Sequence, residues 1–174
     1  MEVFDAIRSR RSVRRYKPEP PPREALEQIA EAGLWAASGK GLQSVKIIII
    51  TNPELIEKLR VWNREIGGWP ESVDPFYGAP AQLLVISDKS SPNHVYDGAL
   101  AMGNMMLAAH ALGLGSCWIN RARQEFDTAE GKAVLAALGV EGDFEGIAHC
   151  IVGWPDGPEP KAAPRSPGRV LWAE

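Results

Sequence analysis

The sequence predicts an α+β fold or a mixed three-layer sandwich, in one domain that covers residues 1–174. A length of 174 residues with 45% hydrophobic content suffices for a single globular domain with a buried core. Helical and strand-like segments alternate irregularly along the chain, as in layered folds that combine helices and strands. No internal repeat or low-complexity linker divides the sequence, so we expect no second domain.

Four elements are predicted in the first third of the chain. An apolar stripe over residues 3–7 has helical spacing, and a longer helix over residues 22–38 ends where two glycines follow. The β-branched run over residues 44–51 predicts a strand that is buried on both faces. Asn52 precedes a proline and caps a helix over residues 53–62.

The remaining elements follow a turn-rich stretch. Residues 81–88 predict a second buried strand. The helix over residues 97–114 is apolar nearly all round and rich in small residues, so we expect it in the centre of the molecule or at a subunit interface. Residues 116–120 then lie at the edge of the sheet. A helix over residues 129–139, a strand over residues 146–154 and a Pro-rich tail complete the chain.

Charge and composition exclude several classes of protein. A net charge of −3 and a pI near 5.7 argue against a general nucleic-acid binder, which has a basic domain. No apolar run could span a bilayer and no signal-peptide pattern is present, so we expect no membrane contact and a cytoplasmic protein. Cys117 and Cys150 sit in apolar runs and are expected to be reduced core thiols. The three histidines lack metal-ligand spacing, so we expect no protein-bound metal.

One segment is strongly basic although the chain is acidic: residues 8–17 contain six of the 19 lysines and arginines. Three explanations are open: a solvated patch at the end of the first helix, a targeting signal or nucleic-acid contact, and a phosphate site. We favour the phosphate site, because Arg10, Ser12 and Arg14 project to the same side of an extended chain. Paired guanidiniums and a hydroxyl group are suitable donors to phosphate oxygens.

Two glycine-containing segments and the tail are further candidates for ligand contacts. The motifs of classical dinucleotide folds and of phosphate-loop nucleotidases are absent. Residues 38–44, SGKGLQS, are either a flexible helix stop or a ligand contact. Residues 113–120, GLGSCWIN, either pack in the core or let a ligand approach the backbone. Arg165 and Arg169 form a second basic element, in a tail that could equally be a disordered terminus.

Together these segments resemble the nitroreductase-like FMN-dependent oxidoreductase family. RRSVRRY, residues 10–16, is similar to its N-terminal flavin-phosphate motif, and AASGKGLQS, residues 36–44, to its P-S-x-x-N-x-Q-P segment. AHALGLGSCWI, residues 109–119, resembles its A-x-x-x-G-L-G-x-x-W-I segment. VGWP followed by PRSPGRV is similar to its closing strand and its C-terminal arginine. The four matches occur in the family's order and span almost the whole chain.

The resemblance implies a three-layer α/β/α sandwich with a mixed, mainly antiparallel central sheet. It also implies an intertwined homodimer with flavin sites at the interface, FMN as the cofactor, and NADH or NADPH as the electron donor. A small molecule would accept the electrons, and no nucleic acid would be bound.

The resemblance further implies three groups of cofactor-binding residues. The flavin phosphate and ribityl chain would be held by Arg10, Arg11, Ser12, Arg14 and Arg165. Backbone groups beside the isoalloxazine ring would come from Cys117, Trp118, Ile119 and Asn120. The flavin bound mainly by the other subunit would be reached by Ser38, Gly41 and Gln43.

The chain departs from the family pattern near two of these groups. Ala37, Gly41 and Ser44 stand where the family has Pro, Asn and Pro, so we expect a polar contact to the flavin to be missing or replaced by water. Ala163 stands where many relatives carry Lys, and Lys161 would substitute with different geometry. These departures concern the affinity for FMN and not the existence of the site.

The implied activity is hydride transfer through flavin N5 with ping-pong kinetics, from NADH or NADPH to a nitroaromatic, a quinone or a similar conjugated acceptor. No side chain stores a hydride, so the chemistry belongs to the cofactor and no catalytic side chain is assigned. Arg14 is the first candidate to stabilise the reduced flavin. The aromatic residues between positions 62 and 77 form either a wall for a planar acceptor or a minor hydrophobic cluster. Asn63 is a further candidate flavin contact.

Two other classes of protein remain open. A protein that stores or senses FMN, without a dedicated reductase activity, would be yellow but would oxidise neither NADH nor NADPH. A non-flavin adaptor or nucleic-acid contact through the basic segment would be colourless and would bind polyanions in a salt-sensitive manner.

Overall fold

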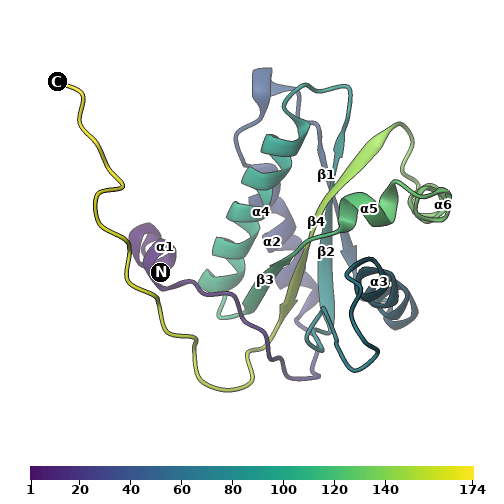
Figure 1. Cartoon of the computed structure of the whole chain (residues 1–174), viewed down its shortest axis with the longest axis horizontal. Helices are drawn as coiled ribbons and strands as arrows, with labels where there is room; N and C mark the ends of the chain where they lie inside the picture. The colour runs from purple at the N-terminus through teal and green to yellow at the C-terminus, as the bar shows by residue number, and fades with distance from the viewer.

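Four antiparallel strands form the centre of the structure, a computed structural model that describes all 174 residues (Figure 1). The strands lie in the order β1-β2-β4-β3, so β1 and β3 are the edges. Their bounds are Val45–Ile50 for β1, Ala81–Asp88 for β2, Gly115–Ile119 for β3 and Phe144–Gly153 for β4. All three neighbouring pairs are antiparallel, and an isolated parallel bridge joins Ser12 to Ser116 at the β3 edge.

Helices cover both faces of this sheet (Figure 1). Helices α2 and α4 pack together on one face, and α3, α5 and α6 contribute side chains to the core on the other. The bounds are Val3–Ser9 for α1, Arg23–Leu34 for α2, Gly39–Gly41 for the 3₁₀-helix η1, Pro53–Ile66 for α3, His94–Ala111 for α4, Ala122–Phe126 for α5 and Ala129–Ala137 for α6.

Strand β2 contributes to two hydrophobic cores. Leu83 and Val85 belong to the core under α2 and α4, whereas Leu84 and Ile86 belong to the core on the opposite face. Successive side chains of a strand point to opposite faces, and here both faces are covered. The prediction of a buried strand over residues 81–88 is therefore confirmed.

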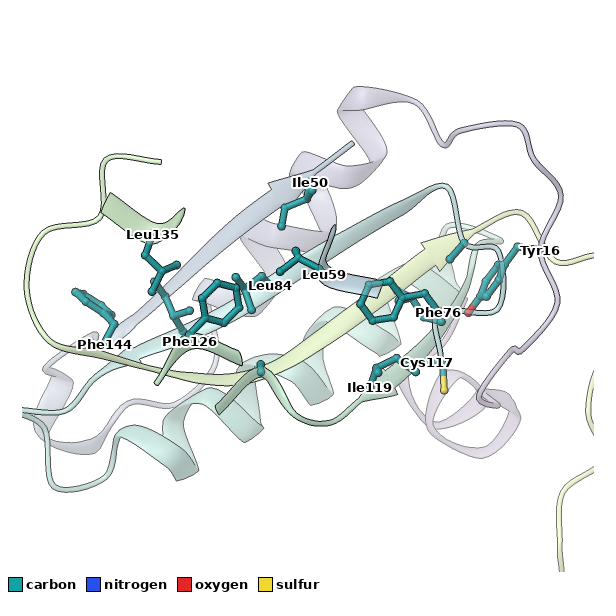
Figure 2. Close-up of a cluster of buried hydrophobic side chains, with 14 residues drawn as sticks. Tyr16, Ile50, Leu59, Phe76, Leu84, Cys117, Ile119, Phe126, Leu135 and Phe144 are labelled. Carbon is teal, nitrogen blue, oxygen red and sulfur yellow. The ribbon is translucent and has the colours of Figure 1, made fainter. Parts of the chain in front are cut away.

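The second core extends under the C-terminal part of the sheet (Figure 2). Phe126 and Phe144 lie toward one end of this cluster. Phe76, Cys117 and Ile119 lie toward the other end, so β3 rests on a well-packed base. This arrangement gives the residues after β3 a rigid support.

The prediction that residues 44–51 are buried on both faces is wrong. Strand β1 is an edge strand whose only neighbour is β2, and Lys46 and Ile49 are exposed. Only Ile50 is fully buried within it. A continuous β-branched run predicts a strand, but its place in the sheet is decided by the partners that cover it.

The helices differ from the predicted ranges in several places; α3, for example, extends four residues further, to Ile66. Helix α2 ends at Leu34, and the next residue, Trp35, is 81% exposed, so the apolar stripe continues where nothing in this chain covers it. Helix α4 begins at His94, one turn earlier than predicted. Helix α5 was not predicted, because five residues are too few to show a helical period.

Helix α4 lies against the sheet, as its apolar sequence predicts. Met102, Met105 and Ala109 are completely buried. Tyr96 and Leu100, near its first turns, are at least half exposed. One face of the helix is therefore buried against the sheet, and another face exposes apolar side chains.

The two cysteines are free and buried, as predicted. Burial raises the pKa of Cys150 to about 12, so this side chain remains a thiol at neutral pH. No helix is long and apolar enough to cross a membrane. After Gly153 the chain contains no helix or strand, and its C-terminal end extends away from the rest of the molecule (Figure 1).

Candidate functional site

The basic segment follows α1 as an extended chain fixed between two strand ends. The Val13 amide donates to the Ser116 carbonyl at 3.0 Å, and Ser12 forms a bridge with Ser116. Further along, the Lys17 amide donates to the Trp154 carbonyl at 2.9 Å. These contacts hold the segment against the start of β3 and the end of β4.

Gly115 allows this close approach. A Cβ atom at position 115 would lie 2.8 Å from the Cβ atom of Val13, well inside van der Waals contact. One alternative for GLGSCWIN was that its small residues let a ligand approach the backbone, but at Gly115 the space is taken by the chain's own N-terminal segment. The glycine thus shapes the site indirectly, by letting the arginines of that segment lie beside β3.

A cavity of about 410 Å³ opens beside the basic segment. It lies where the end of α1, the end of α4, the start of β3 and the tail after β4 come together. Its positively charged or protonatable lining residues are Arg10, Arg11, Arg14, Arg15 and His110. Its acidic lining residues, Asp156 and Glu159, both belong to the tail.

Two of the four arginines are already engaged within the protein. The Arg11 guanidinium donates to the carbonyls of Arg8 and Arg10, which closes the end of α1. The Arg15 guanidinium lies 2.8 Å from a carboxylate oxygen of Asp156 and fixes the tail. Arg11 and Arg15 therefore position the walls of the cavity.

Arg10, Arg14 and Ser116 keep donors that are free. Nη1 of Arg10 and Oγ of Ser116 are buried and have no hydrogen-bond partner, and Arg14 forms neither a hydrogen bond nor an ion pair. A buried donor without an acceptor is costly, and charge-assisted hydrogen bonds to an anion would remove that cost. The donor set fits a phosphate group.

Ser12 does not line the cavity. The basic-segment residues that do are Arg10, Arg11, Val13, Arg14 and Arg15. The predicted same-side arrangement of Arg10, Ser12 and Arg14 therefore holds for the two arginines alone. The hydroxyl that accompanies them is that of Ser116, which the sequence analysis did not single out.

His110 is a second residue that the sequence analysis missed. It lies in the last turn of α4, lines the cavity, and its Nε2 is 2.7 Å from Oγ of Ser9. The signal was present in the sequence, because His110 belongs to the AHALGLGSCWI segment just before its glycines.

The loop over residues 38–44 is organised by a buried carboxylate. The Gly39 amide donates to Oδ1 of Asp97 at 3.0 Å, and Oγ of Ser44 donates to Oδ2 of Asp97 at 3.0 Å. Oγ of Ser38 also donates to Asp97, at 3.4 Å. Asp97 is only 4% exposed.

Within one chain the structure separates this loop from the basic segment. Asp97 lies in the first turn of α4 and His110 in the last, and a helix of 18 residues is about 27 Å long. Ser38 and Gln43 border a smaller cavity of about 120 Å³. Gly41 lies in the same loop, and none of these three residues lines the basic cavity.

Strand β3 carries the third predicted group. Cys117 and Ile119 point into the core (Figure 2), and Trp118 is half-buried on the opposite face. Asn120 is exposed, and its Oδ1 accepts a hydrogen bond from Nε1 of Trp118 at 2.5 Å. The strand lies next to the basic segment, so the structure brings these two predicted groups together.

A buried polar network supports the end of β3. Nδ2 of Asn63 donates to the Asn120 carbonyl at 2.7 Å and to Oε1 of Glu125 at 2.6 Å. Oε2 of Glu125 lies 2.7 Å from Nε2 of His149. Asn63, Glu125 and His149 are at most 1% exposed. The Asn63 amide group is thus used inside the protein, where it fixes the backbone at Asn120.

Backbone strain is found in the segments that the sequence analysis identified. The non-glycine residues with a left-handed backbone are Lys40, Gln43, Tyr77 and Arg121. Two belong to the loop over residues 38–44, one follows β3 by two residues, and one ends the aromatic stretch. This conformation is unfavourable for residues with a Cβ atom and is concentrated at functional sites in proteins.

The aromatic stretch separates into core and surface residues. The Phe76 ring is 1% exposed and lies 5.3 Å from the His149 ring, so it belongs to the hydrophobic core. Trp69 and Tyr77 are 38% and 39% exposed and contact arginine side chains. The interpretation as a hydrophobic cluster is thus confirmed for Phe76, whereas a wall for an acceptor at Trp69 and Tyr77 stays a prediction.

The tail does not bring Arg165 to the cavity. Its guanidinium donates to the Ala163 carbonyl at 2.7 Å, and the side chain is exposed. The tail residues that do line the cavity are 155–160.

Comparison with known proteins identifies the family. The model of the nitroreductase family matches residues 7–154 of this chain. A nitroreductase from Bacteroides fragilis with bound FMN superimposes with a TM-score of 0.91 and 29% identity, over the full length of both chains. An iodotyrosine deiodinase from Thermotoga neapolitana is 28% identical over an alignment of 177 positions, which covers 91% of each chain.

A further relative, from Methanothermobacter thermautotrophicus, is named for both NADH dehydrogenase and NAD(P)H nitroreductase activities. It is 34% identical over 127 residues, which are 68% of this chain but 60% of that protein. The matched family region includes the basic segment from Arg8 onward, the loop over residues 38–44 and all four strands. This chain belongs to the nitroreductase family.

Proposed function

We propose that this protein is an FMN-dependent NAD(P)H oxidoreductase that reduces a nitroaromatic, a quinone or a similar conjugated acceptor. The observation that carries the proposal is the pair of buried, unpartnered donors, Nη1 of Arg10 and Oγ of Ser116, in the basic cavity. Together with the free guanidinium of Arg14 they match the donors that a flavin phosphate requires. The FMN-bound relative from Bacteroides fragilis supports the same cofactor.

FMN bound in this cavity would supply the redox chemistry, hydride transfer between NADH or NADPH and the acceptor. The residues of this chain supply position and electrostatics. Cys117 to Asn120 present the backbone beside the ring, and the Asn63 amide holds the last of these carbonyls in place. Arg14 directly follows Val13, whose amide donates to the Ser116 carbonyl at the start of β3, and its guanidinium is free to stabilise negative charge on a reduced flavin.

We further propose an intertwined homodimer of three-layer α/β/α subunits. The separation between the basic cavity and the loop over residues 38–44 supports it, because Ser38, Gly41 and Gln43 would reach the flavin of the other subunit. Exposed apolar side chains on α1 and α4, such as Phe4 and Leu100, also support a dimer interface on these helices. Arg165, remote from the cavity in a single chain, would complete the phosphate site in the dimer.

The first experiment is an absorption spectrum of the purified protein, before and after anaerobic addition of NADH or NADPH. Flavin bands that bleach on addition of the nicotinamide would support the reductase. Bands that persist would favour the storage or sensor protein, and no bands after reconstitution with FMN would contradict the cofactor assignment.

Reductive deiodination is a second candidate activity, favoured by the similarity to the Thermotoga neapolitana deiodinase along 91% of both chains. The test is anaerobic incubation of the reduced holoprotein with 3-iodo-L-tyrosine. Release of iodide at a rate comparable to the reduction of nitroaromatics would favour the deiodinase, whereas no release would leave the oxidoreductase alone.

A further inference from the structure

The segment between α3 and β2 contacts two arginines, one from the basic segment and one directly after Asn120. The Arg121 guanidinium lies 4.2 Å from the centroid of the Trp69 ring, and the Arg14 guanidinium lies 6.0 Å from that of the Tyr77 ring. Both rings are more than one-third exposed. Trp69 and Arg121 thus form an exposed aromatic and cationic pair directly after β3.

Arg121 has the features of a residue retained for its side chain. Its φ is 85°, a left-handed conformation that glycine adopts without strain and arginine does not. Its guanidinium forms no ion pair, although Arg123, two residues later, pairs with Glu145 at 3.5 Å. The Trp69 face orients this charge and leaves its N–H groups free.

We propose that Arg121, held against Trp69, binds a carboxylate group on the electron acceptor, and that the preferred acceptors are planar aromatic anions. This inference rests on the proposed function, since it places the acceptor beside Cys117 to Asn120. A guanidinium binds a carboxylate through two parallel hydrogen bonds, and an exposed aromatic ring provides a flat surface for the acceptor.

A nitrobenzoate is an acceptor of this class for which the reaction balances. One NADH or NADPH supplies a hydride and the solvent supplies a proton. One N–O bond of the nitro group breaks, and its oxygen leaves as water. The nitro compound becomes the nitroso compound, the nicotinamide is oxidised, and the carboxylate bound by Arg121 is unchanged.

The test compares 4-nitrobenzoate with 4-nitrobenzamide, which has the same nitro group and ring but no charge. We expect Arg121→Gln to lower the ratio of their kcat/KM values about tenfold, through loss of a charged hydrogen bond. Arg121→Lys should retain part of the ratio. Arg123→Gln, with the same change of charge two residues away, should leave the ratio unchanged.

A second variant guards against misfolding. Arg121→Gly removes the side chain but suits the left-handed backbone, so the fold and the FMN content should be retained. Calorimetric titration of the FMN-loaded protein with benzoate and benzamide measures binding without turnover. We expect the preference for benzoate to disappear in Arg121→Gly.

The outcomes separate this inference from the proposed function. If the wild type reduces both nitro compounds and binds benzoate no better than Arg121→Gly does, the carboxylate site is wrong and the oxidoreductase stands. If the wild type reduces neither compound with NADH or NADPH, but prefers benzoate through Arg121, the proposed activity is wrong and the anion site stands.

Discussion

The two ends of α4 treat charge in opposite ways. At the first turn, the buried carboxylate of Asp97 accepts hydrogen bonds from the amide of Gly39 and the hydroxyl of Ser44. At the last turn, His110 borders a cavity in which donors of Arg10 and Ser116 have no acceptor. One end is satisfied within the chain, and the other requires an anion.

This difference teaches that a glycine-rich loop is not by itself an anion site. The loop over residues 38–44 has the composition of a phosphate loop, but its Gly39 amide is already bound to a carboxylate. The basic segment has no such composition, yet the side-chain donors of its Arg10 and Arg14 are free. The affinity for anions depends on which acceptors the fold already supplies.

The largest expected effect comes from removing the free charges at the basic end. In the double variant Arg10→Ala/Arg14→Ala, two charge-assisted contacts to the phosphate are lost, and the Kd for FMN should rise roughly 100-fold. The fold should persist, because neither side chain forms an ion pair. Quenching of FMN fluorescence measures the affinity, and circular dichroism checks the fold.

The matched control for this variant is Arg23→Ala/Arg123→Ala, which removes the same charge from exposed positions outside the cavity. Its Kd for FMN should stay within a factor of about two, since charges screened by solvent act weakly at a distance. Unchanged flavin occupancy in Arg10→Ala/Arg14→Ala would refute the phosphate assignment.

The second effect tests how the basic segment is held in place. In Gly115→Val the added side chain would collide with Val13, and overpacking of this kind costs about 1–3 kcal/mol of stability. The affinity for FMN should fall as well, because the arginines shift with the segment. Chemical denaturation measures the first quantity and flavin titration the second.

Gly103 provides the contrast within the same molecule. A Cβ atom there meets no other atom within 4 Å, and the residue lies in α4. Gly103→Ala should therefore leave FMN affinity unchanged and stabilise the protein by up to about 1 kcal/mol. A loss of affinity in this variant as large as that in Gly115→Val would mean that the close contact with Val13 is not the cause.

The third effect addresses the opposite end of α4. Asp97→Asn replaces a buried acceptor of several hydrogen bonds by a weaker one, and we expect a loss of about 1–3 kcal/mol in the free energy of unfolding. Asp5→Asn, an exposed carboxylate, should change stability little. Equal stability of the two variants would show that Asp97 does not organise the loop.

Much of the fold could be predicted from local patterns. The continuous apolar run of residues 81–88 and the apolar length of α4 led to a buried strand and a central helix, because burial on all sides leaves a continuous hydrophobic run. Exposure of β1 could not be predicted in this way. Its isoleucines resemble those of a central strand, and only the order of the strands places it at the edge.

The segments that form the site could be predicted from the sequence, but the side chains with free donors could not. The concentration of charge led to the basic segment, and the structure shows that Arg10 and Arg14 are free while Arg11 and Arg15 are not. That division depends on contacts with carbonyls and with Asp156, which a linear sequence does not display. Ser116 was missed for the same reason.

The smallest effect concerns the two histidines of α4. His110→Phe removes one hydrogen bond, to Ser9, and one polar group from the cavity wall, so the Kd for FMN should rise about threefold. His110→Gln can still bond to Ser9 and should restore most of the affinity. His94→Phe, at the other end of the helix, loses a comparable bond to the Ser91 carbonyl but should leave the Kd unchanged. If both phenylalanine variants weakened FMN binding equally, the position of His110 beside the cavity would not be the cause. A general loss of helix stability would then explain the weaker binding.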